Sequence, residues 1–121
     1  MTAAGGERPF DFEAYAAAVE GKDAAAWAEF FVEDAVWLEY RGRNPPRSPN
    51  VIAGRTAIRE FLEQVAAAPF RLEVSHPVVS PERAAYRAWI TFADDRQIIE
   101  HVILELADGR IVRQVDVEAW D

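Results

Sequence analysis

The second half of the chain limits the possible folds more than any other part. From Phe70 onward the sequence alternates between apolar and polar residues in segments separated by turn signals, Asp94-Asp95 and Asp108-Gly109. Alternation with a period of two is typical of strands, and Asp-Gly between two strands is typical of a hairpin. We therefore predict an antiparallel meander whose strands cover roughly residues 70–76, 84–92, 98–106 and 111–119.

The first half has helical patterns instead. An apolar stripe between Asp11 and Gly21 predicts a first helix, with the Asp11 side chain as its N-terminal cap. A second helix is expected after Asp23, which is its N-terminal cap, with an apolar face formed by Trp27, Phe30 and Phe31. The third is expected to follow Gly54 and to end at Pro69, because proline cannot continue a helix.

One short strand and one long loop are expected between the second and third helices. Residues 35–40 alternate, with Trp37 and Glu39 on one face, and residues 41–53 contain three prolines. The whole pattern predicts an α+β domain in which three N-terminal helices pack in a strongly curved, mixed but mainly antiparallel sheet. Such a sheet can form a cone with an internal pocket. Residues 1–9 are expected to be a flexible leader, and residues 10–121 a single domain.

Composition excludes several classes of partner. The 121 residues carry a net charge of −8, which argues against nucleic acids and anionic membranes and allows a small hydrophobic molecule. There is no cysteine, so thiolate chemistry and disulfides are excluded. No apolar run reaches transmembrane length, and the first nine residues lack the pattern of a signal peptide. We expect a cytoplasmic protein that binds neither membranes nor nucleic acids.

Glu100 is the most unusual residue of the predicted sheet. With a period of two it shares a strand face with four apolar residues, Ile98, Val102, Leu104 and Leu106. A carboxyl in such surroundings loses its water, which raises its pKa and favours the protonated form. Acids of this kind are either paired structural groups or functional acids, and a structural partner could be Arg87 or Arg113.

Four segments occur in a fixed order: Tyr15–Val19 before Gly21 and Asp23, then 31–39, then 54–62, and finally Glu100-His101 with Asp108–Ile111. Together they make the chain resemble the nuclear transport factor 2-like superfamily, in particular its ketosteroid isomerase and SnoaL-like polyketide cyclase branch. The resemblance extends from Tyr15 to Trp120. It implies the cone-shaped fold and an isomerase or cyclase activity, although this fold also carries other activities.

The resemblance to ketosteroid isomerase implies roles for three residues. Tyr15 falls on the tyrosine of the oxyanion hole, Glu39 on the general base, and Glu100 on the protonated acid beside that tyrosine. Both acids are glutamates where that family has aspartates, which moves each carboxyl by about an ångström, more than the ~0.5 Å tolerance of a catalytic group. The expected reaction is proton transfer on a small, largely apolar carbonyl substrate, without a cofactor.

Asp116 supports a second hypothesis. Residues 109–116 also resemble the last strand of limonene-type epoxide hydrolases, which implies that Glu100 and Asp116 act as an acid–base pair. The arginine that this family has two residues before its first acid is Ile98 here. A two-residue turn at Asp108-Gly109 would pair Glu100 with Val117 and point Asp116 outward, whereas a three-residue turn would pair Glu100 with Asp116.

Several apolar side chains are candidates for a substrate-binding wall, although the tryptophans could equally be core or interface residues. The candidates are Trp27, Trp37, Phe61, Trp89, Val102 and Trp120. His76 and His101 do not have the spacing of metal ligands, so no metal is expected. A third hypothesis, from another functional class, is a non-catalytic module that binds a small ligand.

The opposite face of the strand that carries Glu100 is a mixed stripe. It consists of Ile99, His101, Ile103 and Glu105. Relatives of this fold dimerise through that side of the sheet, so the resemblance implies a homodimer.

Overall fold

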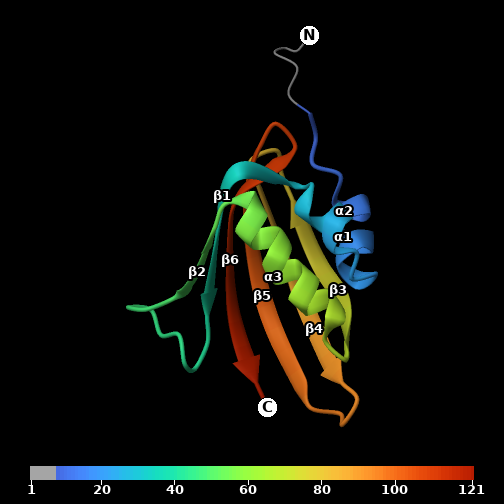
Figure 1. Cartoon of the computed structure of the whole chain (residues 1–121). Coiled ribbons are helices and arrows are strands. Elements are labelled where there is room, and N and C mark those ends of the chain that lie inside the picture. The colour runs from blue at the N-terminus through green and yellow to red at the C-terminus, as the bar shows by residue number, and fades with distance from the viewer. Residues whose placement is uncertain (1–7) are drawn as a thin grey trace.

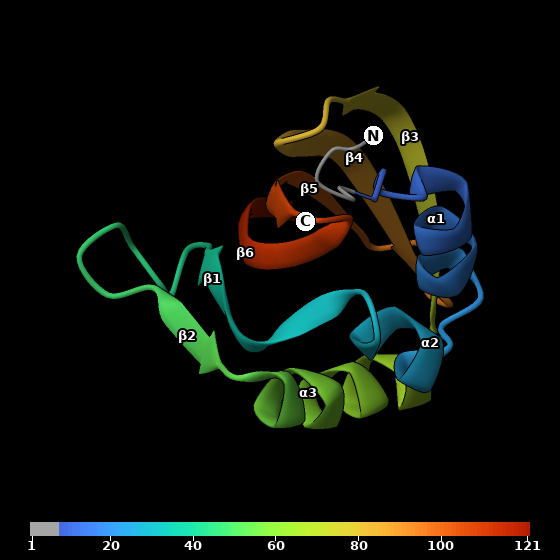
Figure 2. The ribbon, with the colours of Figure 1, turned by 90° about the horizontal axis from the view of Figure 1, so that it is seen from above.

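Six strands form one curved sheet, and three helices lie against its concave side (Figures 1 and 2). The structure is a computed structural model that describes residues 8–121. The helices are α1 Phe12–Glu20, α2 Ala24–Ala28 and α3 Arg55–Ala67. The strands are β1 Phe31–Tyr40, β2 Asn50–Ala53, β3 Phe70–Val79, β4 Arg83–Phe92, β5 Gln97–Ala107 and β6 Arg110–Trp120.

The strand order places the first and last strands of the chain next to each other. The order is β2-β1-β6-β5-β4-β3, with β1 parallel to β6 and every other neighbouring pair antiparallel. The sheet does not close, and its strong curvature gives the predicted cone (Figure 2). The α+β prediction and the predicted meander are confirmed. The pairing of β1 with β6 brings residues far apart in sequence onto one inner face.

Two predicted helix caps are confirmed, and the expected extent of the second helix is wrong. The carboxylates of Asp11 and Asp23 accept hydrogen bonds from the backbone N–H groups of Ala14 and Ala26, at 3.0 and 3.1 Å. Helix α2 stops at Ala28, and Phe31 belongs to β1. The aromatic ring of Phe31 is fully buried as part of β1. Tertiary packing of this ring therefore determines its structure, and the helical spacing of Trp27, Phe30 and Phe31 does not.

The segment 41–53 was expected to be a loop throughout, but its last four residues form β2. They pair antiparallel with β1, from Asn50 opposite Glu39 to Ala53 opposite Val36. Hydrogen bonding along the free edge of β1 outweighs the weak strand pattern of these four residues. The remainder, residues 41–49, projects from the body of the molecule at the left of Figure 2.

Most of the expected flexible leader lies outside the described residues, which begin at residue 8. Arg8 itself is attached to the sheet, because its backbone N–H donates to the Asp108 carboxylate at 2.8 Å. This contact places Arg8 and Pro9 against the turn between β5 and β6.

A substitution at that turn tests how tightly the chain packs there. Gly109 has a φ of +76°, and a Cβ added to it would lie 2.9 Å from the Pro9 carbonyl oxygen. Gly109→Ala should therefore lower the free energy of unfolding by about 1–3 kcal/mol, measured by urea denaturation. Gly42→Ala is the control, because a Cβ at Gly42 would meet nothing within 4 Å. Equal stability of the two variants would contradict the described packing.

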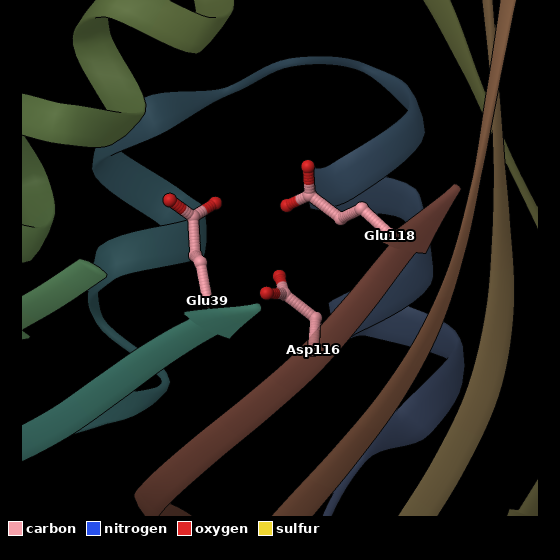
Figure 3. Close-up of side chains that lie close together, drawn as sticks. All are labelled: Glu39, Asp116 and Glu118. Atoms are coloured by element: carbon pink, nitrogen blue, oxygen red, sulfur yellow. The ribbon is translucent and has the colours of Figure 1, made fainter. Parts of the chain in front are cut away.

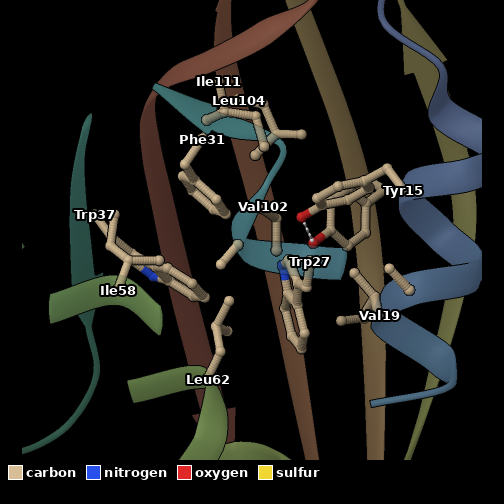
Figure 4. Packing of buried hydrophobic residues seen from close by; sticks show 14 of the residues in the cluster. Tyr15, Val19, Trp27, Phe31, Trp37, Ile58, Leu62, Val102, Leu104 and Ile111 are labelled. Carbon is tan, nitrogen blue, oxygen red and sulfur yellow. Dashed lines mark hydrogen bonds between the residues drawn. The ribbon is translucent and has the colours of Figure 1, made fainter. Parts of the chain in front are cut away.

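The hydrophobic core fills the space between the helices and the inner sheet face (Figure 4). Its largest fully buried members include Tyr15, Phe31, Ile58, Leu62, Leu104 and Ile111. The outer sheet face is less covered: Trp89, Ile103 and Val117 are 36, 50 and 58% exposed. The homodimer through this face stays a prediction. None of the helices in the described part of the chain is long and apolar enough to cross a membrane.

Candidate active site

A cavity of about 160 Å³ lies between the helices and the inner face of the sheet. Its wall is mostly apolar, and most of its polar side chains come from the neighbouring strands β1, β6 and β5. The polar side chains that line it are Glu39, Arg41, Tyr86, Glu100, Gln114 and Glu118. An apolar hollow with a few convergent polar groups is the usual form of a small-molecule site.

Glu39 lines this cavity and is held between two neighbouring strands. Its Cα is level with Asn50 on β2 and with Asp116 on β6. The Asn50 amide donates to the Glu39 carboxyl at 2.8 Å between Nδ2 and Oε1. The strand pattern correctly placed Glu39 with Trp37, but Asn50 was missed because β2 was expected to be loop.

The register of the last hairpin matches neither of the two predicted alternatives. The turn Asp108-Gly109 has two residues, as the simpler alternative required, since Ala107 pairs with Arg110. An irregularity then follows, because Leu106 pairs with Ile111 while Glu105 pairs with Arg113. This β-bulge moves every later pair by one residue.

As a result Glu100 lies opposite Glu118, and Asp116 lies opposite Val102. All four residues point to the inner face of the sheet, because residues directly opposite one another in a ladder share a face. The expectation that a two-residue turn would point Asp116 outward is therefore wrong. Glu118 was missed as a site residue, since the sequence carries no clear signal for a bulge at this turn.

Asp116 is fully buried and does not line the cavity. The indole Nε1–H of Trp37 donates to its Oδ2 at 3.1 Å, whereas Oδ1 has no hydrogen-bond partner among residues 8–121. A buried acceptor without a partner is costly, unless the group is protonated or takes part in the chemistry of the site. Asp116 thus forms a second layer behind Glu39.

Glu39, Asp116 and Glu118 converge on one point (Figure 3). Each contributes a carboxyl oxygen, and these oxygens all lie within 4.8 Å of one another. The Glu118 side chain is 3% exposed, and it accepts a hydrogen bond from Trp120 Nε1 at 2.8 Å. Arg41 is the nearest cation, with its guanidinium 4.0 Å from the same Glu118 oxygen.

Burial and mutual repulsion change the protonation of these acids. Burial raises the pKa of Glu39 to about 7; the Asn50 hydrogen bond opposes this shift and repulsion from Glu118 adds to it. Burial, with repulsion from Glu39 and Glu118, raises the pKa of Asp116 to about 8. Burial also raises the pKa of Glu100 well above its ordinary value, helped by repulsion from Asp116 and Glu118. These effects favour the protonated form of Glu100, which can donate a hydrogen bond.

These shifts predict how stability depends on pH. A carboxyl whose pKa is higher in the folded state stabilises the fold fully only below its unfolded pKa, and loses that contribution as pH rises through the folded pKa. The free energy of unfolding should thus fall between about pH 4 and pH 8, the interval set by the ordinary and raised values of Glu39 and Asp116.

Asp116→Asn should flatten this fall, because the asparagine cannot ionise but can still accept the Trp37 hydrogen bond. Asp34→Asn, at an exposed position of β1, is the matched control and should leave the slope as it is. Urea denaturation at a series of pH values measures both variants. Stability that stays constant or rises across this interval in the native protein would contradict the raised pKa values.

Tyr15 does not line the cavity, because a second tyrosine, Tyr86, lies between Tyr15 and the cavity. The two hydroxyl oxygens of Tyr15 and Tyr86 are 2.6 Å apart and hydrogen-bonded, as the dashed line in Figure 4 shows. Tyr86 lines the cavity, whereas Tyr15 is fully buried. Ala88 lies opposite Glu100 on β5, so Tyr86 is one step further along the same face. The alternation of β4 could have identified Tyr86, because Ala84, Tyr86, Ala88 and Ile90 are its buried residues.

Four of the six apolar residues expected to bind substrate do line the cavity: Trp27, Trp37, Phe61 and Trp120. Trp89 does not, because it alternates with the inward-facing Ala88 and Ile90 and lies on the outer face. Val102 does not line it either, since it is packed in the core beneath the acids, opposite Asp116.

The three converging carboxyls are also the only group in the described chain with a spacing that suits a metal ion. Oxygen ligands are those that Mg²⁺ and Ca²⁺ prefer. All three acids already accept hydrogen bonds from neutral donors, which are the side chains of Asn50, Trp37 and Trp120. That no metal is bound stays a prediction.

Comparison with known proteins gives one family match. The model of the SnoaL-like domain matches residues 12–114. None of the curated proteins matches the chain.

Solved structures with the same fold are numerous. An NTF2-like protein of unknown function from Mesorhizobium loti is 23% identical, with a TM-score of 0.76 over 89% of this chain and 87% of its own. A proposed ketosteroid isomerase from Kribbella flavida is 23% identical, with a TM-score of 0.73 over 91 and 74%. SalBIII, an epoxide hydrolase/cyclase-like enzyme in pyran ring formation of salinomycin, is 19% identical, with a TM-score of 0.69 over 89 and 87%. At these identities the likeness establishes the fold alone.

Proposed function

The chain belongs to the SnoaL-like domain family, and we propose that it is a cofactor-free enzyme that moves a proton within a small, largely apolar carbonyl compound. The reaction is an isomerisation or a cyclisation through an enolate. One of the similar structures is named as a proposed ketosteroid isomerase, which supports the isomerisation. The single observation that carries the proposal is that two carboxyl groups, those of Glu39 and Glu100, line one mostly apolar cavity.

Glu39 is the base of the proposed reaction. Its pKa of about 7 leaves a large fraction ionised at neutral pH, and makes it a stronger base than an ordinary glutamate. The carboxylate removes a proton from the carbon next to the carbonyl group. The electron pair of that C–H bond forms a carbon–carbon double bond, and the π electrons of the carbonyl group move to its oxygen, which gives an enolate. Glu39 then returns the proton to another carbon, or the enolate carbon attacks a second carbonyl group, whose oxygen takes the proton from Glu39.

Glu100 stabilises the oxygen on which the negative charge develops. Because its raised pKa keeps it neutral, its O–H can donate a hydrogen bond to the enolate oxygen. Tyr86, on the same inner face, is placed to donate a second one. Tyr15 acts through Tyr86 as a positioning residue, since its hydroxyl reaches Tyr86 and not the cavity. The mostly apolar wall excludes water, which strengthens both hydrogen bonds.

The proposed roles predict the pH dependence of catalysis. Activity needs Glu39 ionised, so kcat/KM should increase as pH rises through about 7. It should decrease again once Glu100, whose pKa is raised by burial, loses its proton. The test is the rate at which a β,γ-unsaturated cyclohexenone becomes the conjugated isomer, followed by ultraviolet absorbance. A rate that decreases with rising pH in this interval would contradict the assignment of Glu39 as base.

A second candidate is an epoxide hydrolase that uses Glu100 and Asp116. The observation in its favour is that Asp116 faces inward next to Glu39. Against it, Asp116 does not line the cavity and lies opposite Val102 instead of Glu100. Incubation with a small cyclic epoxide in isotopically labelled water tests it: a labelled diol product would favour the hydrolase over the isomerase.

A further inference from the structure

Arginines are concentrated in one part of an otherwise acidic chain. Residues 40–59 contain five of the 13 Lys and Arg residues and no Asp or Glu, although the chain has 21 acids. Two of the five have partners near α3: Arg55 donates to the Phe31 carbonyl oxygen, and Arg59 pairs with Glu63. The other three, Arg41, Arg43 and Arg47, belong to the loop that connects β1 and β2.

This loop borders a second hollow outside the cavity. The hollow has a volume of about 490 Å³ and is lined by residues 41–43 and 118–120. Arg41, Glu118 and Trp120 line both the hollow and the cavity, so the two spaces share a wall. The cavity and the hollow therefore adjoin at these three side chains.

The two arginines of the hollow differ in how they are held. The Arg41 guanidinium lies 5.3 Å from the Trp120 ring, and its Nε donates to Asn44 Oδ1 at 3.0 Å. These contacts fix its orientation but leave donor hydrogens free. Arg43 is exposed, and among residues 8–121 no carboxylate lies within 4.0 Å of it. The hollow thus has two guanidinium groups for one carboxyl, that of Glu118.

We propose that Arg41 and Arg43 bind an anionic end of the substrate, a carboxylate or a phosphate, while its apolar carbonyl end occupies the cavity. The inference rests on the proposed function for the role of the cavity. Inside the cavity, the Glu39 carboxylate and the mostly apolar wall disfavour an anion, whereas guanidinium groups bind carboxylate and phosphate oxygens well. The charge distribution therefore fixes which end of the substrate enters. The substrate class is a small ketone or enone that carries an acid group.

A matched pair of ligands tests the anion site. para-Hydroxyphenylpropanoate places a phenol, which resembles an enol, in the cavity and a carboxylate near the loop; its primary amide has the same shape without the charge. Isothermal titration calorimetry at low ionic strength should show that the acid binds about tenfold more tightly than the amide. Arg43→Gln should remove this preference. Arg47→Gln should keep it, because Arg47 is in the same loop but does not line the hollow.

A second measurement does not depend on the cavity. In a nitrogen-labelled sample, titration with inorganic phosphate should give saturable shifts of the Arg43 Nε–H and Trp120 Nε1–H signals in NMR spectra. About 0.5 M NaCl should weaken the response by screening. The proposal is overturned if no saturable shift occurs, if acid and amide bind equally, or if Arg43→Gln and Arg47→Gln behave alike. If the protein binds the acid more tightly than the amide but catalyses no proton transfer, the anion site is supported and the proposed function is rejected.

Discussion

Replacement of Glu39 by Gln should reduce the isomerisation rate of a β,γ-unsaturated cyclohexenone by about 10²- to 10⁴-fold. The amide has nearly the shape of the carboxyl group, but it cannot accept a proton from carbon. The Asn50 side chain can still donate to the amide oxygen, so the position of residue 39 is retained. We expect the loss in kcat with little change in KM, because substrate binding depends mainly on the apolar wall.

Two controls make this result specific. Glu33→Gln changes an exposed glutamate of the same strand and should leave the rate unchanged. The Glu39→Gln protein should also be at least as stable as the native protein at about pH 8, because the buried ionised group is gone. A rate within a factor of about two of the native rate would remove Glu39 from the mechanism.

The second large effect is expected at Glu100, where two substitutions separate its possible roles. Glu100→Leu removes the hydrogen-bond donor and should lower kcat by about 10²- to 10³-fold. Glu100→Gln keeps a neutral donor and should lose much less. An ionised Glu100 acting as base would instead give equal losses in both variants, since glutamine cannot accept a proton any more than leucine can.

The pH profile adds an independent measure of the same substitutions. In the native protein kcat/KM should decrease at high pH when Glu100 ionises, and this decrease should be absent in Glu100→Gln. Glu105→Gln, at an exposed position of β5, is the matched control. Equal losses in Glu100→Gln and Glu100→Leu, with an unchanged pH profile, would contradict a role as neutral hydrogen-bond donor.

The fold was predictable because its main elements follow from short-range patterns. Asp11 and Asp23 cap helices as predicted, and the alternating segments after Phe70 all form strands. The predictions that were wrong concern elements that depend on pairing with strands far away in the sequence. Neither Phe31 as the start of β1 nor β2 within residues 41–53 has a strong local pattern, because each is determined by hydrogen bonding to a strand far away in sequence.

The candidate site was predictable in part for the same reason. Glu39 and Glu100 do line one cavity, as the strand alternation and the resemblance implied. Glu118 could not be placed, because a single-residue bulge at the β5–β6 hairpin reverses which side chains face inward. The position of Tyr15 behind Tyr86 depends on how the helix packs on β4, which no periodicity encodes.

Hydrogen–deuterium exchange tests most directly whether the cavity is a proton-transfer site or only a binding site. Cyclohexanone incubated with the native protein in heavy water should exchange the hydrogens next to its carbonyl group far faster than in buffer alone. The rate should increase through about pH 7, following the Glu39 carboxyl. Exchange should fall to the buffer rate in Glu39→Gln and persist in Glu33→Gln. Exchange no faster than in buffer, from a protein that still binds the ketone, would contradict the proposed chemistry and indicate a non-catalytic ligand-binding module.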